Sequence, residues 1–214
     1  MVNLAKRVRQ ETGSFCGPAV IEMLLAVYGK EVTQAQVVEA CNASKTVMKE
    51  GIPLRDLAIG VKKLFSDLVV WEKQNSSVEE IKVLVDKGYP VAVDWQGIFT
   101  TDEYGDEIWN SKDRVSGWWA RVTKAPVSVG DQGHYCVVTE VSTKKGVLKY
   151  VDPYGHYAGK DRFVAIWEFE ERWWDDRLER SAERKMGVVL ENKLMFVVAP
   201  KTDVFLKTVG MTRI

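Results

Sequence analysis

Apolar residues in the first ninety positions recur mostly at helical spacing. The segment Val20–Tyr28 is almost entirely apolar and follows Gly17-Pro18, and proline is favoured where a helix begins. Residues 54–65 place apolar side chains three and four positions apart, which is the pattern of a helix with one buried face. Thr33 is a suitable N-cap, and Ser77 with Glu80 forms a capping box. We therefore predict four helices, over residues 20–28, 33–41, 54–65 and 78–87.

After residue 90 the pattern changes towards that of β-strands. Short runs rich in β-branched and aromatic residues are bounded by Gly, Pro, Asp or Ser, as strands usually are. Strands are predicted over residues 68–71, 90–95, 134–141, 147–152 and 193–199. Residues 163–176 are predicted to be helical. Because most helices come early and most strands late, we predict an α+β fold with an antiparallel sheet.

The chain shows no linker rich in Gly, Ser or Pro, and residues 1–214 are expected to form a single domain. Residues 96–130 have no clear periodicity and contain Trp109, Trp118 and Trp119. A long segment of this kind is often a functional loop or lid, and an edge hairpin with aromatic packing is the alternative. Residues 201–214 are expected to be a C-terminal extension that packs back on the domain.

Thirty basic and thirty acidic residues give a formal net charge of zero. This balance argues against nucleic acid or a membrane surface as partner, since binders of both carry a basic excess. The sequence has no apolar run long enough to cross a bilayer, and its first residues lack the apolar core of a secretory signal. A cytoplasmic location is the expectation.

The three cysteines are far apart and have no metal-site spacing, so neither a disulfide framework nor a zinc site is expected. Cys16 stands at the predicted start of the first helix, where the helix dipole and the unpaired N–H groups favour an anion. A thiol there is expected to ionise more readily than in water, and the thiolate is the nucleophile. Cys41 and Cys136 are interpreted as small buried hydrophobic residues.

The chain has only two histidines, so the choice of a base for Cys16 is narrow. His134 begins one predicted strand and Asp152 ends the next. If the loop between them is the five residues Ser142–Gly146, paired positions in the hairpin sum to about 288 and Asp152 lies opposite Cys136. Residues two apart share a face of the sheet, so His134 and Asp152 would emerge side by side. A loop one residue shorter or longer would put them on opposite faces.

Together these residues predict a catalytic triad in which Cys16 attacks, His134 transfers the proton and Asp152 orients His134. The Gln10 side chain and the backbone N–H of Cys16 would form the oxyanion hole. His156 is the competing base, although a Gly-flanked turn suits a surface residue better. Asp94 and Asp131 are the competing orienting residues.

Three motifs carrying these residues resemble the C39-type cysteine peptidases and the wider C39-like group. They are Gln10-x5-Cys16-Gly17-Pro18-Ala19, Gly133-His134-Tyr135-x-Val137-Val138 and Val151-Asp152-Pro153. The resemblance implies a papain-like fold, with a helical half that carries the cysteine and an antiparallel sheet that carries the histidine and aspartate. Either Phe163-x3-Trp167 or Phe169-x3-Trp173 is similar to the short aromatic helix that often follows the Asp-Pro turn in this group.

The best-known members of that group are fused to ABC exporters and cut leader peptides after a double glycine. No transmembrane or ATPase segment is seen in this chain, and the stretch between residue 95 and His134 is long for the group. The expected function is hydrolysis of peptide bonds in a peptide or protein substrate, without a cofactor or metal. Two alternatives stay open: an amidase or transglutaminase-like acyltransferase with the same triad, and a non-catalytic peptide-binding module.

Overall fold

A seven-stranded antiparallel sheet forms the centre of the computed structural model, which describes residues 2–97, 133–155, 158–180 and 186–214. The strand order is β5-β4-β3-β2-β8-β1-β9. The strands are β1 (Leu68–Lys73), β2 (Val91–Gln96), β3 (Gly133–Ser142), β4 (Val147–Val151), β5 (Asp161–Ala165), β8 (Met195–Pro200) and β9 (Thr212–Arg213). A separate antiparallel pair, β6 (Trp174–Arg180) and β7 (Met186–Asn192), lies against the ends of β2 and β3.

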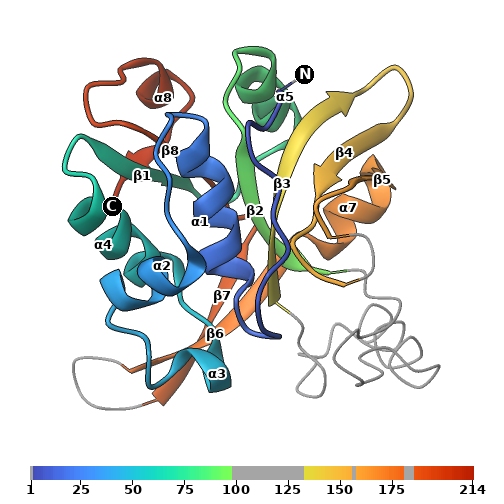
Figure 1. Ribbon diagram of the computed structural model, residues 1–214. Helices are drawn as coiled ribbons and strands as arrows, with labels where there is room; N and C mark the ends of the chain where they lie inside the picture. Colours follow the sequence, from blue (N-terminus) through green and yellow to red (C-terminus); the bar gives the residue numbers. More distant parts are fainter. Residues whose placement is uncertain (1, 98–132, 156–157, 181–185) are drawn as a thin grey trace.

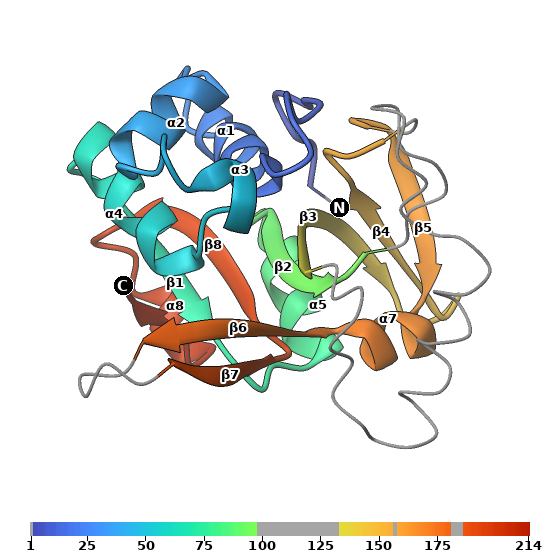
Figure 2. The same ribbon diagram turned by 90° about the horizontal axis from the view of Figure 1, so that it is seen from below.

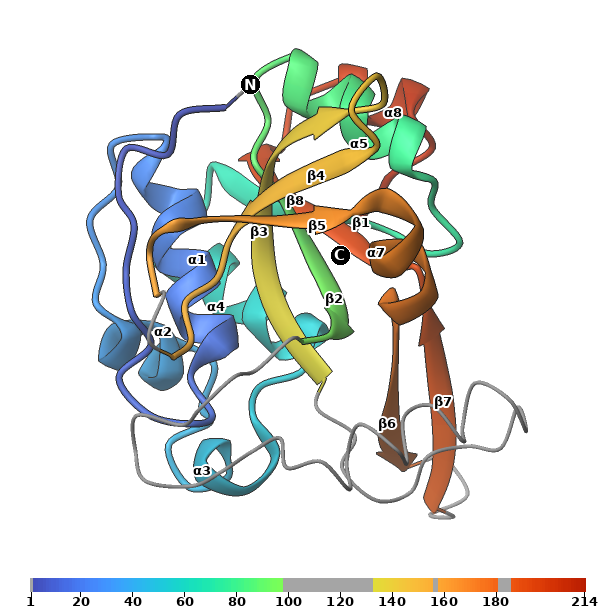
Figure 3. The ribbon, with the colours of Figure 1, turned by 90° about the vertical axis from the view of Figure 1, so that its right-hand side faces the viewer.

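Helices cover both faces of the large sheet (Figures 1 and 3). One face carries α1 (Cys16–Ala26), α2 (Gln34–Ala40) and α4 (Leu54–Leu64), whose apolar side chains form one core with the sheet. The other face carries α5 (Val78–Asp86), α7 (Ile166–Arg172) and α8 (Phe205–Thr208) over a second core. The short α3 (Val47–Glu50) follows α2, and in Figure 2 it lies on the same side of the molecule as α1, α2 and α4.

The predicted α+β class and the antiparallel sheet are confirmed. Both expected caps are present: Thr33 accepts a hydrogen bond from the backbone N–H of Gln36, and Ser77 accepts one from Glu80. The C-terminal residues pack back as expected, because β9 pairs with β1 and Met211 is buried.

The prediction of a helix over residues 163–176 is wrong at both ends. Residues 161–165 form β5, the helix is limited to Ile166–Arg172, and Trp174 begins β6. The apolar spacing around Phe169 and Trp173 is helical, but the flanking residues find partners in β4 and β7. Those cross-strand bonds override a local helical preference.

The predicted lid over residues 96–130 stays a prediction. Only Gln96 and Gly97 of that segment belong to the described part of the chain, and Trp109, Trp118 and Trp119 lie outside it. The single-domain organisation also stays a prediction. None of the helices in the described ranges is both long and apolar enough to traverse a bilayer.

Candidate active site

Cys16 is the first residue of α1, and the local sequence explains why the helix begins there. The N-cap residue Phe15 offers no side-chain hydrogen bond, and the first turn holds no acidic residue. The first turn of a helix leaves its N–H groups without intrahelical partners, and Pro18 has no N–H. In α1 these groups are therefore the N–H groups of Cys16 and Gly17. The half-buried Cys16 side chain is thus at the positive end of the helix dipole.

Gly17 lets this end of α1 approach the sheet closely. A Cβ atom at position 17 would lie 3.0 Å from Cδ1 of Leu57 on α4 and 3.5 Å from the Tyr135 ring on β3. Tyr135 follows His134 directly in the chain. The lack of a side chain at Gly17 therefore helps to bring Cys16 to the beginning of β3, where His134 is buried.

His134 and Asp152 are in direct contact, as the sequence predicted. His134 Nε2 lies 2.7 Å from Asp152 Oδ1, and both side chains are almost completely buried. Cys16 is the other side chain that acts on the imidazole, because its proximity adds to the rise in the pKa of His134. Because Nε2 faces Asp152, the Nδ1 atom is the ring nitrogen left for Cys16. Asp152 and His134 are thus in contact, and Cys16 is close enough to influence the imidazole.

Burial by itself lowers the pKa of His134, because it penalises the imidazolium. The charge and hydrogen bond of Asp152 oppose this effect, and the contact with Cys16 adds to them. Together they raise the pKa of His134 to about 10. The imidazolium form is thereby favoured at neutral pH, in a position where it can stabilise a thiolate at Cys16.

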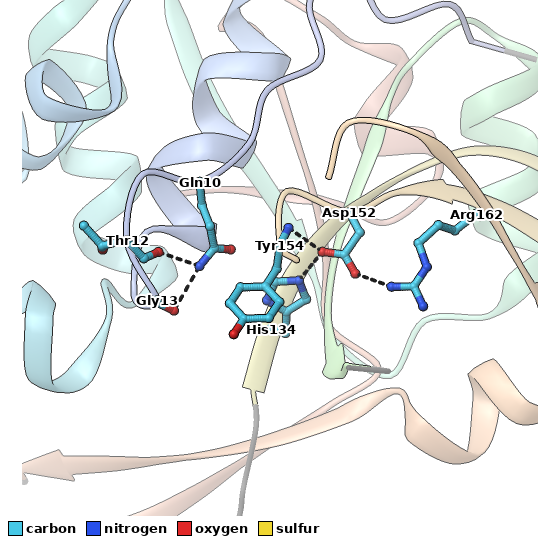
Figure 4. A network of polar contacts seen from close by, with 7 residues as sticks. All are labelled: Gln10, Thr12, Gly13, His134, Asp152, Tyr154 and Arg162. Atoms are coloured by element: carbon cyan, nitrogen blue, oxygen red, sulfur yellow. Dashed lines mark hydrogen bonds and ion pairs between the residues drawn. The ribbon is translucent and has the colours of Figure 1, made fainter. Parts of the chain in front are cut away.

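Asp152 is held by two donors besides His134 (Figure 4). The backbone N–H of Tyr154 donates to Oδ1 at 2.8 Å, and the Arg162 guanidinium donates to Oδ2 at 2.9 Å. The Tyr154 ring meets the imidazole edge-on, with the ring centroids 6.2 Å apart. Both oxygens of this fully buried carboxylate thus have partners, as a buried charge requires.

Sequence reasoning missed Arg162. This arginine lies on β5, which was predicted to be part of a helix or its flank, and it pairs with Tyr150 of β4. Its guanidinium carbon lies 5.4 Å from the centre of the Tyr150 ring. Once β4 and β5 are recognised as a hairpin, the pairing rule brings Arg162 close to Asp152, two residues after Tyr150.

Gln10 is buried in the segment that precedes α1. Its backbone N–H donates to the carbonyl of Pro153 at 2.7 Å, which joins this segment to the turn after Asp152. Its side-chain Nε2 donates to the carbonyls of Thr12 at 2.7 Å and Gly13 at 2.9 Å (Figure 4). Both amide hydrogens are therefore directed at the Thr12–Gly13 turn, so an oxyanion would have to replace one of these acceptors.

A second glutamine fixes this segment. The side chain of Gln34 on α2 is buried, and it accepts from the backbone N–H of Glu11 at 2.9 Å and donates to the carbonyl of Arg9 at 2.8 Å. These two bonds hold the residues on either side of Gln10. No pattern in the sequence indicated this role beyond a glutamine near a helix start.

Of the competing candidates, Asp94 is in the described part of the chain, and it is not part of this arrangement. Asp94 pairs with Tyr135 across β2 and β3, and cross-strand partners share a face, so Asp94 and His134 emerge on opposite faces of the sheet. Asp131 and His156 lie outside the described residues. Within the described ranges, no group of three or more His, Cys, Asp and Glu side chains is arranged to hold a metal ion.

The sequence matches the model of the Peptidase_C39 like family over residues 3–177, which is most of the chain. The chain belongs to the Peptidase_C39 like family. The C39-like assignment agrees with the three motifs around Cys16, His134 and Asp152, all of which fall within the matched range. No match was found among curated protein sequences.

A solved structure with the same fold is the peptidase domain of Streptococcus ComA, described as a bi-functional ABC transporter involved in a quorum-sensing pathway. The TM-score is 0.56 and the sequence identity 18%, with 92% of this chain and 99% of that chain covered. This likeness confirms the papain-like fold expected for a C39-like protein. Family and fold together support a peptidase-type function.

Of the two aromatic pairs considered for the short helix of C39-like proteins, Phe169 and Trp173 are the buried pair. Their ring centroids are 4.9 Å apart, and Trp173 Nε1 donates to the carbonyl of Leu194 at 2.8 Å. Phe163 and Trp167 are exposed. The helix that follows the Asp-Pro turn is therefore anchored through Phe169 and Trp173.

Proposed function

We propose that this chain is a cysteine peptidase that hydrolyses peptide bonds through Cys16, His134 and Asp152. The observation that carries the proposal is the buried contact between Asp152 and His134, next to Cys16 at the start of α1, which adds to the raised pKa of His134. A thiol beside an imidazole that a buried carboxylate orients is the arrangement needed for nucleophilic catalysis.

In the proposed reaction, the Cys16 thiolate attacks the carbonyl carbon of the scissile bond and forms a tetrahedral oxyanion. The backbone N–H of Cys16 faces the developing charge, and the Gln10 amide joins it by exchanging one of its bonds to Thr12 or Gly13. The His134 imidazolium then gives its Nδ1 proton to the leaving amine as the C–N bond breaks. A thioester between Cys16 and the acyl fragment remains.

Hydrolysis of this thioester completes the cycle. His134, now neutral, takes a proton from water as the water attacks the thioester carbonyl. The C–S bond breaks, the acid product leaves, and the thiolate and imidazolium are restored. Asp152 stabilises the imidazolium throughout.

A peptide library incubated with the wild type and with Cys16→Ala, read by mass spectrometry, tests this proposal. New amine and acid termini that depend on Cys16 are the expected result. Adding a primary amine acceptor separates hydrolysis from acyl transfer, because an acyltransferase would give amide adducts in place of the free acid. Equal behaviour of wild type and Cys16→Ala, together with retained peptide binding, would overturn the proposal in favour of a binding module.

A further inference from the structure

The second oxygen of the buried Asp152 carboxylate is bound by a cation that the proposed reaction does not use. Oδ1 receives His134 Nε2 and the backbone N–H of Tyr154, whereas Oδ2 receives Nη1 of Arg162 at 2.9 Å. The Asp152 side chain is fully buried, and the Arg162 side chain is only 17% exposed. Charge-assisted hydrogen bonds of this kind are stronger than hydrogen bonds between neutral groups.

From this geometry we propose that Arg162 is a positioning residue of the site. It holds the Asp152 carboxylate in the orientation that aligns it with His134, and it shares the negative charge of Asp152 with the imidazolium. This inference rests on the proposed function, because it assigns Arg162 to the same site. Arg162 contacts Asp152, and it acts on His134 only through that carboxylate.

The orientation part follows from the hydrogen bonds. A carboxylate that accepted only at Oδ1 could turn about its Cβ–Cγ bond and lose the alignment with the imidazole. The bond from Arg162 to Oδ2 fixes this rotation from the side opposite to His134. Arg162 is itself fixed by its place on β5, paired with Tyr150, and by the packing of its guanidinium over the Tyr150 ring.

The charge part follows from the groups that surround the buried carboxylate and imidazole. The charged groups around the imidazole are Cys16 from α1, Asp152 after β4, Arg162 from β5 and Asp175 of β6, whose carboxylate lies against Gly133. Without Arg162, the imidazolium would be the only cation paired with Asp152. His134 would then hold its proton more tightly and would give it to the leaving amine less readily. With Arg162, the Asp152 charge is shared between two cations.

The experiment compares Arg162→Met and Arg162→Lys with the control Arg7→Met. Arg7 forms a similar arginine–aspartate pair with Asp161, at 2.8 Å, but it does not touch Asp152. The first readout needs no substrate: the titration of the His134 ring, followed by NMR in a Cys16→Ser background so that the thiol does not contribute. The second readout is the kcat and KM of each variant, with Cys16 intact, on a peptide cleaved by the wild type.

For Arg162→Met we expect a higher pKa of His134 and a kcat that is roughly 10- to 100-fold lower, with KM unchanged, as for other groups that orient a functional histidine. Arg162→Lys keeps the charge, so its His134 titration should stay close to the wild type while kcat is only partly restored. Arg7→Met should match the wild type in both readouts. If Arg162→Met does not fold, Arg162→Lys decides alone, because loss of the planar guanidinium should still lower kcat.

Two outcomes separate the inference from the proposed function. If Arg162→Met folds and changes neither the His134 titration nor kcat, the role of Arg162 is overturned and the peptidase proposal stays intact. If Arg162→Met does not fold, an unchanged kcat in Arg162→Lys has the same meaning. If the wild type cleaves no peptide, but the pKa of His134 is still higher in Arg162→Met than in the protein with Arg162, the peptidase proposal is overturned and the role of Arg162 stays in place.

Discussion

Asp152 lies 2.7 Å from His134, although the turn between their strands has an even number of residues. A turn of even length should by itself put the two side chains on opposite faces of the sheet. Ser142 pairs with Val147, so the turn is the four residues Thr143–Gly146 and not the five that the sequence analysis assumed. At the turn, paired positions sum to 289. Continued unchanged, this register would put Asp152 opposite Val137, on the face of the sheet away from His134.

A β-bulge at Thr139 corrects the register. The pairing shifts between Val138 and Glu140, so that beyond the bulge Val138 pairs with Tyr150 and the sum becomes 288. The extra residue is buried, and its carbonyl accepts from the backbone N–H of Val2 at 2.8 Å. The predicted register at the site was therefore right, but the reason given for it was wrong. Bulges often re-aim a side chain in this way next to active sites.

Alkylation of the three cysteines should be strongly selective for Cys16. Burial, with the nearby Asp56 adding to it, raises the pKa of Cys41 to about 11, and burial also raises the pKa of Cys136, with Asp152 as the next cause. Both thiols are thus protonated and covered at neutral pH. Peptide mapping after brief treatment with iodoacetamide should find the label on Cys16 alone, and in Cys16→Ala on no cysteine. Equal labelling of all three cysteines would contradict the role of His134 as the base for Cys16.

Replacing Asp152 with asparagine should lower the pKa of His134. The substitution keeps the shape of the side chain and removes the charge that most strongly opposes the effect of burial on the pKa of His134. NMR titration of the two histidine rings measures this, with His156 as an internal reference. If the chain cleaves peptides, Asp152→Asn should also lower kcat by about 10²- to 10⁴-fold. A His134 pKa that stays near 10 would show that Asp152 is not its cause.

The charged His134 should make the folded state more stable at neutral pH than at alkaline pH. Its pKa is raised in the folded protein, so the stabilisation is fully present below the unfolded value near 6.5 and is lost as the pH rises towards the folded value. In Cys16→Ala, where no thiol titrates with it, the unfolding free energy should fall over this range by at most about 1.4 kcal/mol per pH unit. Urea unfolding of Cys16→Ala and Cys16→Ala/His134→Gln at several pH values measures the difference. Parallel curves for the two proteins would contradict the prediction.

The parts of the fold that the sequence predicted are those with strong local signals. The caps at Thr33 and Ser77, and the buried strand from Val91, needed no knowledge of distant residues. The strand β5 and the β6–β7 pair were missed because β5 and β6 carry several charged residues, and these segments become strands by pairing within hairpins that no turn signal indicated. In the site, Cys16, His134 and Asp152 followed from motifs, whereas Arg162 and Gln34 did not, since their roles exist only once β5 and α2 are in place.

Gln34 is expected to support the site from a distance by holding the backbone around Gln10. Gln34→Met keeps the length of the side chain but removes its bonds to the Arg9 carbonyl and the Glu11 N–H, which are part-buried. This should cost about 1–3 kcal/mol of unfolding free energy, measured by urea unfolding. The matched control is Gln36→Met on the same helix, which removes the bond from the Thr33 N–H to the Gln36 side chain and should cost about 0.5–1.5 kcal/mol. If peptides are cleaved, only Gln34→Met should lower kcat, because only this substitution frees the Gln10 segment to move relative to Cys16. Equal kcat values in the two variants would show that Gln34 contributes to stability alone.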